Sequence, residues 1–244
     1  MGTLRIMAAT MAALVLASSF AVAGPTGQIN IPSTDAKGLK EVTISVNNYA
    51  RFSSAADAGP NSYGIGIVTG LLPFEKVKLE IGADYTTLGA GTVYPFSFNA
   101  KFATAEDALF TGMPAFAAGG YNLGTISAAY PQNIVYGLIA KTLPVVGRFS
   151  VGGYNGAERS LGSKVNNGIM ASWDRTISEV SDKLWLGIDY MSGKNSDNEI
   201  SFGGSWSFTK QVTLLLGVTV PNAGQSALLG GKPTFTTQLS VNLP

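Results

Sequence analysis

Apolar and polar residues alternate with a period of two along most of the chain after about residue 40. In the clearest segment, 77–85, every odd position is apolar or aromatic, and the positions between them hold Lys78, Glu80, Gly82 and Asp84. A period of two places successive side chains on opposite faces of a β-strand. The pattern therefore predicts strands that each have one apolar and one polar face.

Twelve segments follow this pattern, and short connections alternate with longer ones between them. They are 41–52, 62–71, 77–85, 96–102, 115–122, 133–143, 148–155, 168–176, 183–191, 200–208, 212–220 and 234–243. An even strand number with alternating tight turns and long loops is typical of outer-membrane barrels. The chain is predicted to be all-β: residues 41–244 form a closed antiparallel up-and-down transmembrane β-barrel of about 12 strands.

Parts of the pattern occur twice, about 105 residues apart. Four residues of the first half recur at the same offsets in the second: Lys78, Gly82, Asp84 and Tyr85 correspond to Lys183, Gly187, Asp189 and Tyr190. The repeat favours an internal duplication, with two related halves of six strands each.

The charged side chains of the polar faces are the candidate lumen-lining residues. They are Lys78, Glu80, Asp84, Lys101, Lys141, Arg148, Asp174, Lys183 and Asp189. Two roles remain open for these nearly balanced charges. They form ion pairs that brace the wall, or they line a conducting path and set a weak selectivity.

The tyrosines give a separate prediction. With the short turns placed in the periplasm, all nine collect near the opposite rim, where amphipathic rings prefer a membrane–water boundary. The predicted interfacial girdle is Tyr49, Tyr63, Tyr85, Tyr94, Tyr121, Tyr130, Tyr136, Tyr154 and Tyr190.

The first residues read as a secretory signal. Arg5 precedes an apolar run over 7–22, and Ala21 and Ala23 form a small-x-small cleavage site, so residues 1–23 are predicted to be removed. Residues 24–40 are not periodic and are predicted to be a periplasmic lead-in segment. The sequence leaves open whether this segment or a long loop fills the lumen.

Composition narrows the chemistry. The chain has no Cys and no His, 13% charged residues and a net charge of +1. Thiol chemistry, Ser-His catalysis and the commonest zinc sites are excluded, and nothing indicates nucleic acid. Asn195, Asp197 and Glu199 lack the spacing of an EF-hand loop. No enzyme activity, cofactor or metal site is predicted.

Residues 24–33, Gly-Pro-Thr-Gly-Gln-Ile-Asn-Ile-Pro-Ser, resemble the opening of the YjbH-like group of Gram-negative outer-membrane β-barrel proteins. The resemblance implies an outer-membrane location and a link to export of exopolysaccharide or other envelope material. It identifies no functional residue. The chain ends at Asn242, Leu243 and Pro244, whereas such barrels usually end on an aromatic residue that the barrel-assembly machinery reads.

The sequence thus favours an outer-membrane barrel that acts as a small passive channel or as a structural envelope protein. Its expected partners are outer-membrane lipid, the barrel-assembly machinery and, if the lumen is open, small solutes. The alternative is a soluble periplasmic β-barrel that binds an apolar ligand, in which the apolar faces point inward. A membrane-embedded lipid hydrolase is a third hypothesis, although no serine lies in a recognisable motif.

Overall fold

The computed structural model describes residues 26–55, 61–87, 95–124, 132–161, 166–222 and 232–244. The predicted signal peptide and its cleavage site lie outside this part of the chain, as do Tyr94 and Tyr130. No helix among the described residues is both long and apolar enough to cross a membrane.

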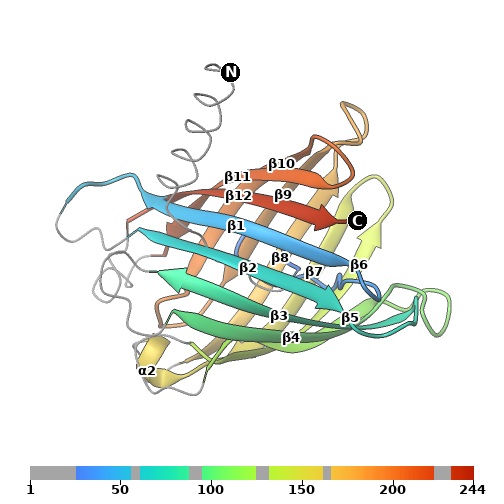
Figure 1. The fold of residues 1–244 in the computed structure, drawn as a ribbon, viewed down its shortest axis with the longest axis horizontal. Coiled ribbons are helices and arrows are strands. Elements are labelled where there is room, and N and C mark those ends of the chain that lie inside the picture. The colour runs from blue at the N-terminus through green and yellow to red at the C-terminus, as the bar shows by residue number, and fades with distance from the viewer. Residues whose placement is uncertain (1–25, 56–60, 88–94, 125–131, 162–165, 223–231) are drawn as a thin grey trace, which may run out of the picture.

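Twelve antiparallel strands form a closed barrel, in which each strand pairs with its neighbours in sequence and β1 pairs with β12 (Figure 1). The strands are β1 Val42–Arg51, β2 Ser62–Gly70, β3 Val77–Thr87, β4 Phe96–Thr104, β5 Ala115–Leu123, β6 Ile134–Leu143, β7 Gly147–Asn155, β8 Asn167–Thr176, β9 Leu184–Met191, β10 Glu199–Ser207, β11 Val212–Pro221 and β12 Thr234–Leu243. A short helix, α2 Glu158–Leu161, lies between β7 and β8. The predicted barrel is confirmed, with strand ends within two residues of those expected. The internal duplication stays a prediction.

The two ends of the barrel differ in their connections. One end, here the turn end, has the connections 71–76, 105–114, 144–146, 177–183 and 208–211, together with the end of β12. The other end, the loop end, has the connections that follow β1, β3, β5, β7, β9 and β11. Successive strands run in opposite directions, so successive connections lie at opposite ends of the barrel.

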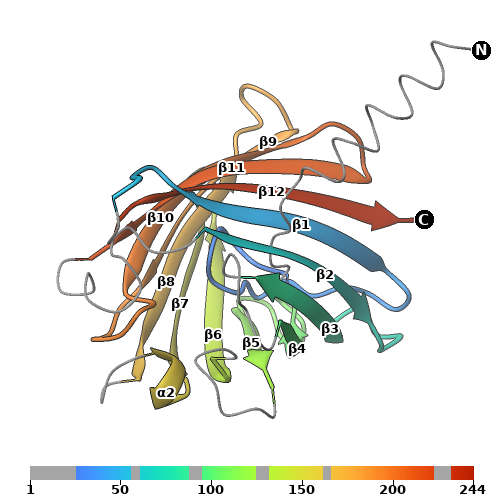
Figure 2. The same cartoon turned by 60° about the vertical axis from the view of Figure 1, so that its left-hand side comes forward.

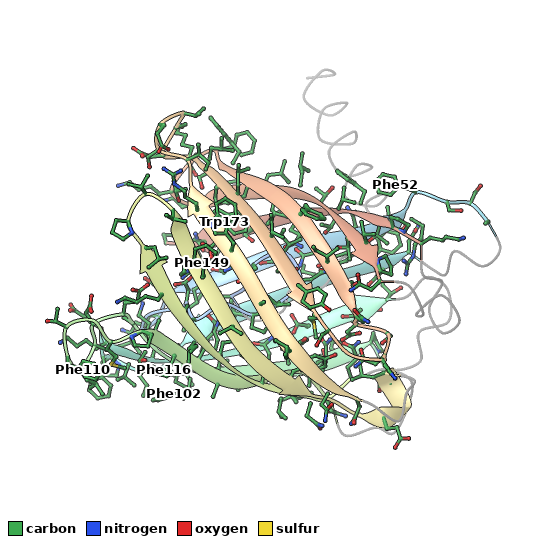
Figure 3. The ribbon with its side chains drawn as sticks, turned by 180° about the vertical axis from the view of Figure 1, so that it is seen from behind. Phe52, Phe102, Phe110, Phe116, Phe149 and Trp173 are labelled. Carbon is green, nitrogen blue, oxygen red and sulfur yellow. The ribbon has the colours of Figure 1, made fainter. Side chains whose placement is uncertain are left out.

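The outer surface of the barrel is apolar and the inner surface is largely polar. Outward side chains such as Phe98 are 59% exposed, and Figure 3 shows Phe102, Phe116 and Phe149 on the outside. Inward residues such as Glu80 and Asp189 are at most 1% exposed. A soluble ligand-binding barrel has the opposite arrangement, since water would meet its polar face. The structure therefore disfavours the soluble alternative.

Residues 26–37, which we call the plug, lie inside the barrel (Figures 1 and 2). The plug reverses direction: Gly27 bridges to Pro32, and the amide of Gln28 donates to the carbonyl of Ile31 at 2.8 Å. The expected periplasmic position of this segment is corrected. The plug does not pair with a barrel strand, so several of its backbone N–H groups need other hydrogen-bond acceptors. The inward carboxylates of the wall supply these acceptors.

Candidate functional site

Asp189 of β9 holds the centre of the plug. One of its carboxylate oxygens accepts the backbone N–H groups of Ile29 at 2.8 Å, Asn30 at 2.7 Å and Ile31 at 3.4 Å. Hydrogen bonds to a charged group are worth about 1.5–3 kcal/mol each, roughly twice as much as neutral ones. A buried carboxylate thus serves as the acceptor for a turn of irregular backbone.

Glu80 of β3 and Lys101 of β4 hold the start of the plug. Glu80 accepts the Thr26 amide at 2.8 Å, the Thr26 hydroxyl at 2.5 Å and the Lys37 amide at 3.0 Å. Lys101 lies 3.5 Å from Glu80 and donates to the Thr26 carbonyl at 2.6 Å. Both charged side chains are fully buried, and a buried ion pair is favourable only when further hydrogen bonds complete it. The plug supplies these bonds.

A third anchor joins β7, β8 and both ends of the plug. Arg148 contacts Asp174 at 3.0 Å through Nε and Asp35 at 2.8 Å through Nη1. Asp174 also accepts from Gln28 Nε2 at 2.8 Å and from the indole N–H of Trp185 at 3.2 Å. The predicted charges of this wall therefore pair with one another and with the plug.

The remaining plug contacts reach β10, β11, β12 and β1. Asn30 Nδ2 donates to Glu199 at 2.7 Å. The Ile29 carbonyl accepts from Gln238 at 2.8 Å and from the Tyr49 hydroxyl at 3.3 Å. The plug is thus bonded to strands around most of the barrel.

An apolar cluster beside the plug is formed by side chains of β5, β6, β7, α2, β8 and β9. Ile31 of the plug belongs to it, and the other members are Tyr121, Ile134, Tyr136, Leu138, Tyr154, Leu161, Met170 and Met191. All members are at most 8% exposed. We call the interior along β3–β9, with its charge anchors and this cluster, the sealed side.

Most of the predicted lumen residues face the interior. These are Glu80, Asp84, Lys101, Arg148, Asp174 and Asp189. Asp84 bonds to Asn99 of the wall at 2.8 Å. Lys78 is half-buried at the turn end of β3, and Lys183 is exposed in the turn before β9.

The prediction for Lys141 is wrong. Lys141 pairs in register with the exposed Phe149 and shares its outward face. Its ammonium lies 3.0 Å from Glu106 and 3.7 Å from Asp107, both in the turn between β4 and β5. β6 is apolar on both faces, so the identity of the inward face was not readable from its sequence.

The tyrosine girdle is also corrected. Tyr121, Tyr136 and Tyr154 belong to the buried cluster, and Tyr49 bonds to the plug. The outward tyrosines of the described residues are Tyr63, Tyr85 and Tyr190, of which Tyr85 is 37% exposed and packs edge-on against Phe96. A plugged interior offers buried sites for aromatic rings, which the alternation rule alone did not anticipate.

A polar cavity of about 770 Å³ runs beside the plug. Most of the strand residues in its wall lie on β10, β11, β12 and β1, and it also meets the edge of the sealed side at Tyr121 and Met191. Many wall residues on these four strands are hydroxyl-bearing: Thr43, Ser45, Ser205, Ser207, Thr213, Thr219, Thr234 and Ser240. Among the described residues, none from β4, β6 or β7 lines it. We call this half of the interior the open side and the cavity the passage.

The passage has lining residues at both ends of the barrel. Lys183 and Asn242 lie at the turn end, and Arg51 and Asp197 lie at the loop end. Its charged lining residues are Lys37, Arg51 and Lys183 against Asp182, Asp197 and Glu199, so the two signs are equal in number. The passage thus extends along the barrel and offers hydrogen-bonding groups with little net charge.

Comparison with known proteins gives a likeness of fold. No family model matches the sequence, and no curated protein matches it. The crystal structure of the COG4313 outer membrane channel from Pseudomonas putida F1 has a TM-score of 0.54 and 11% identity, covering 88% of this chain and 100% of that chain. The Salmonella typhi OmpF complex with daunomycin has a TM-score of 0.39 and 8% identity, covering 83% and 96%. The likeness to the COG4313 channel shows that the chain has the fold of an outer-membrane barrel. The YjbH-like resemblance stays a prediction.

Proposed function

We propose that this protein spans the outer membrane and lets small polar solutes diffuse through the passage beside the plug. The observation that carries the proposal is the passage itself, a polar cavity of about 770 Å³ with lining residues at both ends of a closed barrel. Diffusion would be graded by the width of the passage and by its wall, and no chemical step is required.

Three further features support the membrane location. The barrel has no free strand edge, because β1 pairs with β12 along its whole length. Its outer surface is apolar, which lipid covers without cost. The fold is similar to that of a protein described as an outer membrane channel. Delivery by the barrel-assembly machinery belongs to the same proposal.

Planar-bilayer recording of the refolded full chain tests the proposal. We expect small unitary currents with a linear dependence on salt concentration. A matched variant, Ser205→Trp, places a bulky ring in the open-side wall and should reduce the current. A barrel that inserts but gives no unitary current, with either sequence, would contradict the channel function.

A structural envelope role is the second candidate. The observation in its favour is the extent of the plug anchorage, with Glu80, Asp174, Asp189 and Glu199 all bonded to it. Loss of envelope integrity on deletion of the gene, with no change in solute uptake, would favour this role over the channel.

A further inference from the structure

Two buried acceptors on the passage have no hydrogen-bond donor in the protein. Gln28 is 5% exposed, and its Oε1 has no partner although its Nε2 is fixed by Asp174. Asn47 of β1 is 7% exposed, and its Oδ1 also has no partner. Both residues line the passage. A buried acceptor without a donor costs about 1–3 kcal/mol, so each of these positions favours an occupant of the passage that donates a hydrogen bond.

The rest of the passage wall indicates what kind of donor fits. Ser45 and Ser240 bring their hydroxyls within 3.3 Å of each other, and Tyr49 and Gln238 add further polar groups beside the plug. Trp185 adds an aromatic ring to the lining, and its indole N–H donates to Asp174, which holds the ring in place. Hydroxyls beside an aromatic ring suit a solute that has hydroxyl groups on an otherwise apolar ring.

Charge argues against an ionic solute. Lys37, Arg51 and Lys183 are matched in number by Asp182, Asp197 and Glu199 among the lining residues. A charged solute would lose hydration in the passage without gaining a net attraction, whereas a neutral one avoids this cost. The volume of about 770 Å³ lies within the roughly 300–1,000 Å³ of small-molecule sites.

We propose that the passage contains a binding site for small uncharged polyhydroxylated solutes, in which Gln28 Oε1 and Asn47 Oδ1 accept hydrogen bonds from solute hydroxyls. This inference rests on the proposed channel function and specifies its solute.

The test measures block of the ion current by D-glucose in planar bilayers, with glucuronate and glucosamine as charged solutes of similar size. We expect glucose to reduce the current saturably. We expect Asn47→Leu to raise the half-blocking concentration about fivefold, the effect of one lost hydrogen bond. Asn47→Asp keeps an acceptor and should restore part of the block.

Ser150→Ala is the matched control. It removes a buried hydroxyl that also lacks a partner but lies on β7, on the sealed side, so block by glucose should not change. The migration of unheated samples in gel electrophoresis checks that each variant is folded. Unitary currents that glucose does not block saturably, or equal block of wild type and Asn47→Leu, would overturn the inference alone. Absence of any current would overturn the channel function as well.

Discussion

The sealed and open sides of the interior are built from different residues for different purposes. The sealed side has the carboxylates of Glu80, Asp174 and Asp189, and each accepts at least one hydrogen bond from the plug. On the open side, β11 and β12 have no charged residue within their strands. The difference teaches that in this barrel the plug is held mainly by buried charge, whereas the walls of β11 and β12 present neutral groups to the passage. Of the two roles open for the wall charges, the structural one fits the described contacts.

Removing the plug is the change with the largest expected effect. Deletion of residues 26–37 leaves the strands intact but takes away what divides the interior. We expect unitary conductance to rise roughly fivefold or more, because the cross-section that the plug occupies then becomes available to ions. Bilayer recording measures this. An unchanged conductance would mean that the two sides do not differ in function.

A smaller effect should follow from weakening one anchor. Asp189→Ala leaves the amides of Ile29, Asn30 and Ile31 without their acceptor, at a cost of about 3 kcal/mol. Hydrogen exchange at these amides should become about 100-fold faster.

Asp84→Ala is the matched control for this anchor. Asp84 is equally buried but bonds to Asn99 of the wall rather than to the plug. Exchange at the plug amides should therefore stay slow in this variant. Equal acceleration in both variants would show that the plug depends on barrel stability in general and not on Asp189.

Charge placed on the open side should change ion preference. Ser45 lines the passage on β1, so Ser45→Lys should shift the reversal potential toward anions and Ser45→Asp toward cations. The two shifts should shrink in 1 M salt, where the screening length is only about 3 Å. Thr209→Lys, in the exposed turn between β10 and β11, is the control and should have no effect. Shifts of the same sign for both Ser45 variants would contradict a passage along this wall.

The smallest expected effect concerns pH. Burial raises the pKa of Asp197 to about 6, although hydrogen bonds from Ser196 and Gln132 act in the opposite direction. The folded loop therefore binds a proton at Asp197 more tightly than the unfolded chain does. The folded state loses stability as the pH rises through about 6, because the buried carboxyl must then carry its charge. Asp197 lines the loop end of the passage, so cation preference should be slightly higher at pH 7.5 than at pH 5.

Asp197→Asn separates this group from its neighbours. Glu199 lies in the same passage, so the wild type alone does not identify the titrating residue. The part of the pH dependence that the variant loses reports Asp197. Identical pH profiles for wild type and variant would show that another group is responsible.

The barrel was predictable from sequence because a period of two is a local signal. In segments such as 77–85 the alternation is strict, so it identifies the apolar and the polar face of the strand without ambiguity. Lys141 escaped the same rule because β6 is apolar on both sides. The plug was not predictable, since its fold depends on acceptors such as Glu80 and Asp189 that come 54 and 160 residues later. Tyr121, Tyr136 and Tyr154 were misplaced for the same reason: only the presence of the plug makes the interior a place to bury rings.

The plug precedes every strand, yet its hydrogen-bond partners reach as far as Asn242, and the bond between Ile29 and Gln238 joins residues 209 positions apart. Such distant pairings form slowly, because the chain must lose the entropy of closing a long loop before the stabilising contacts are made. The segment must therefore stay available until the last hairpin arrives. During biogenesis, insertion of the plug and pairing of β1 with β12 should therefore be late and concurrent events. A barrel that closed without the plug inside could take it up only through the turn end.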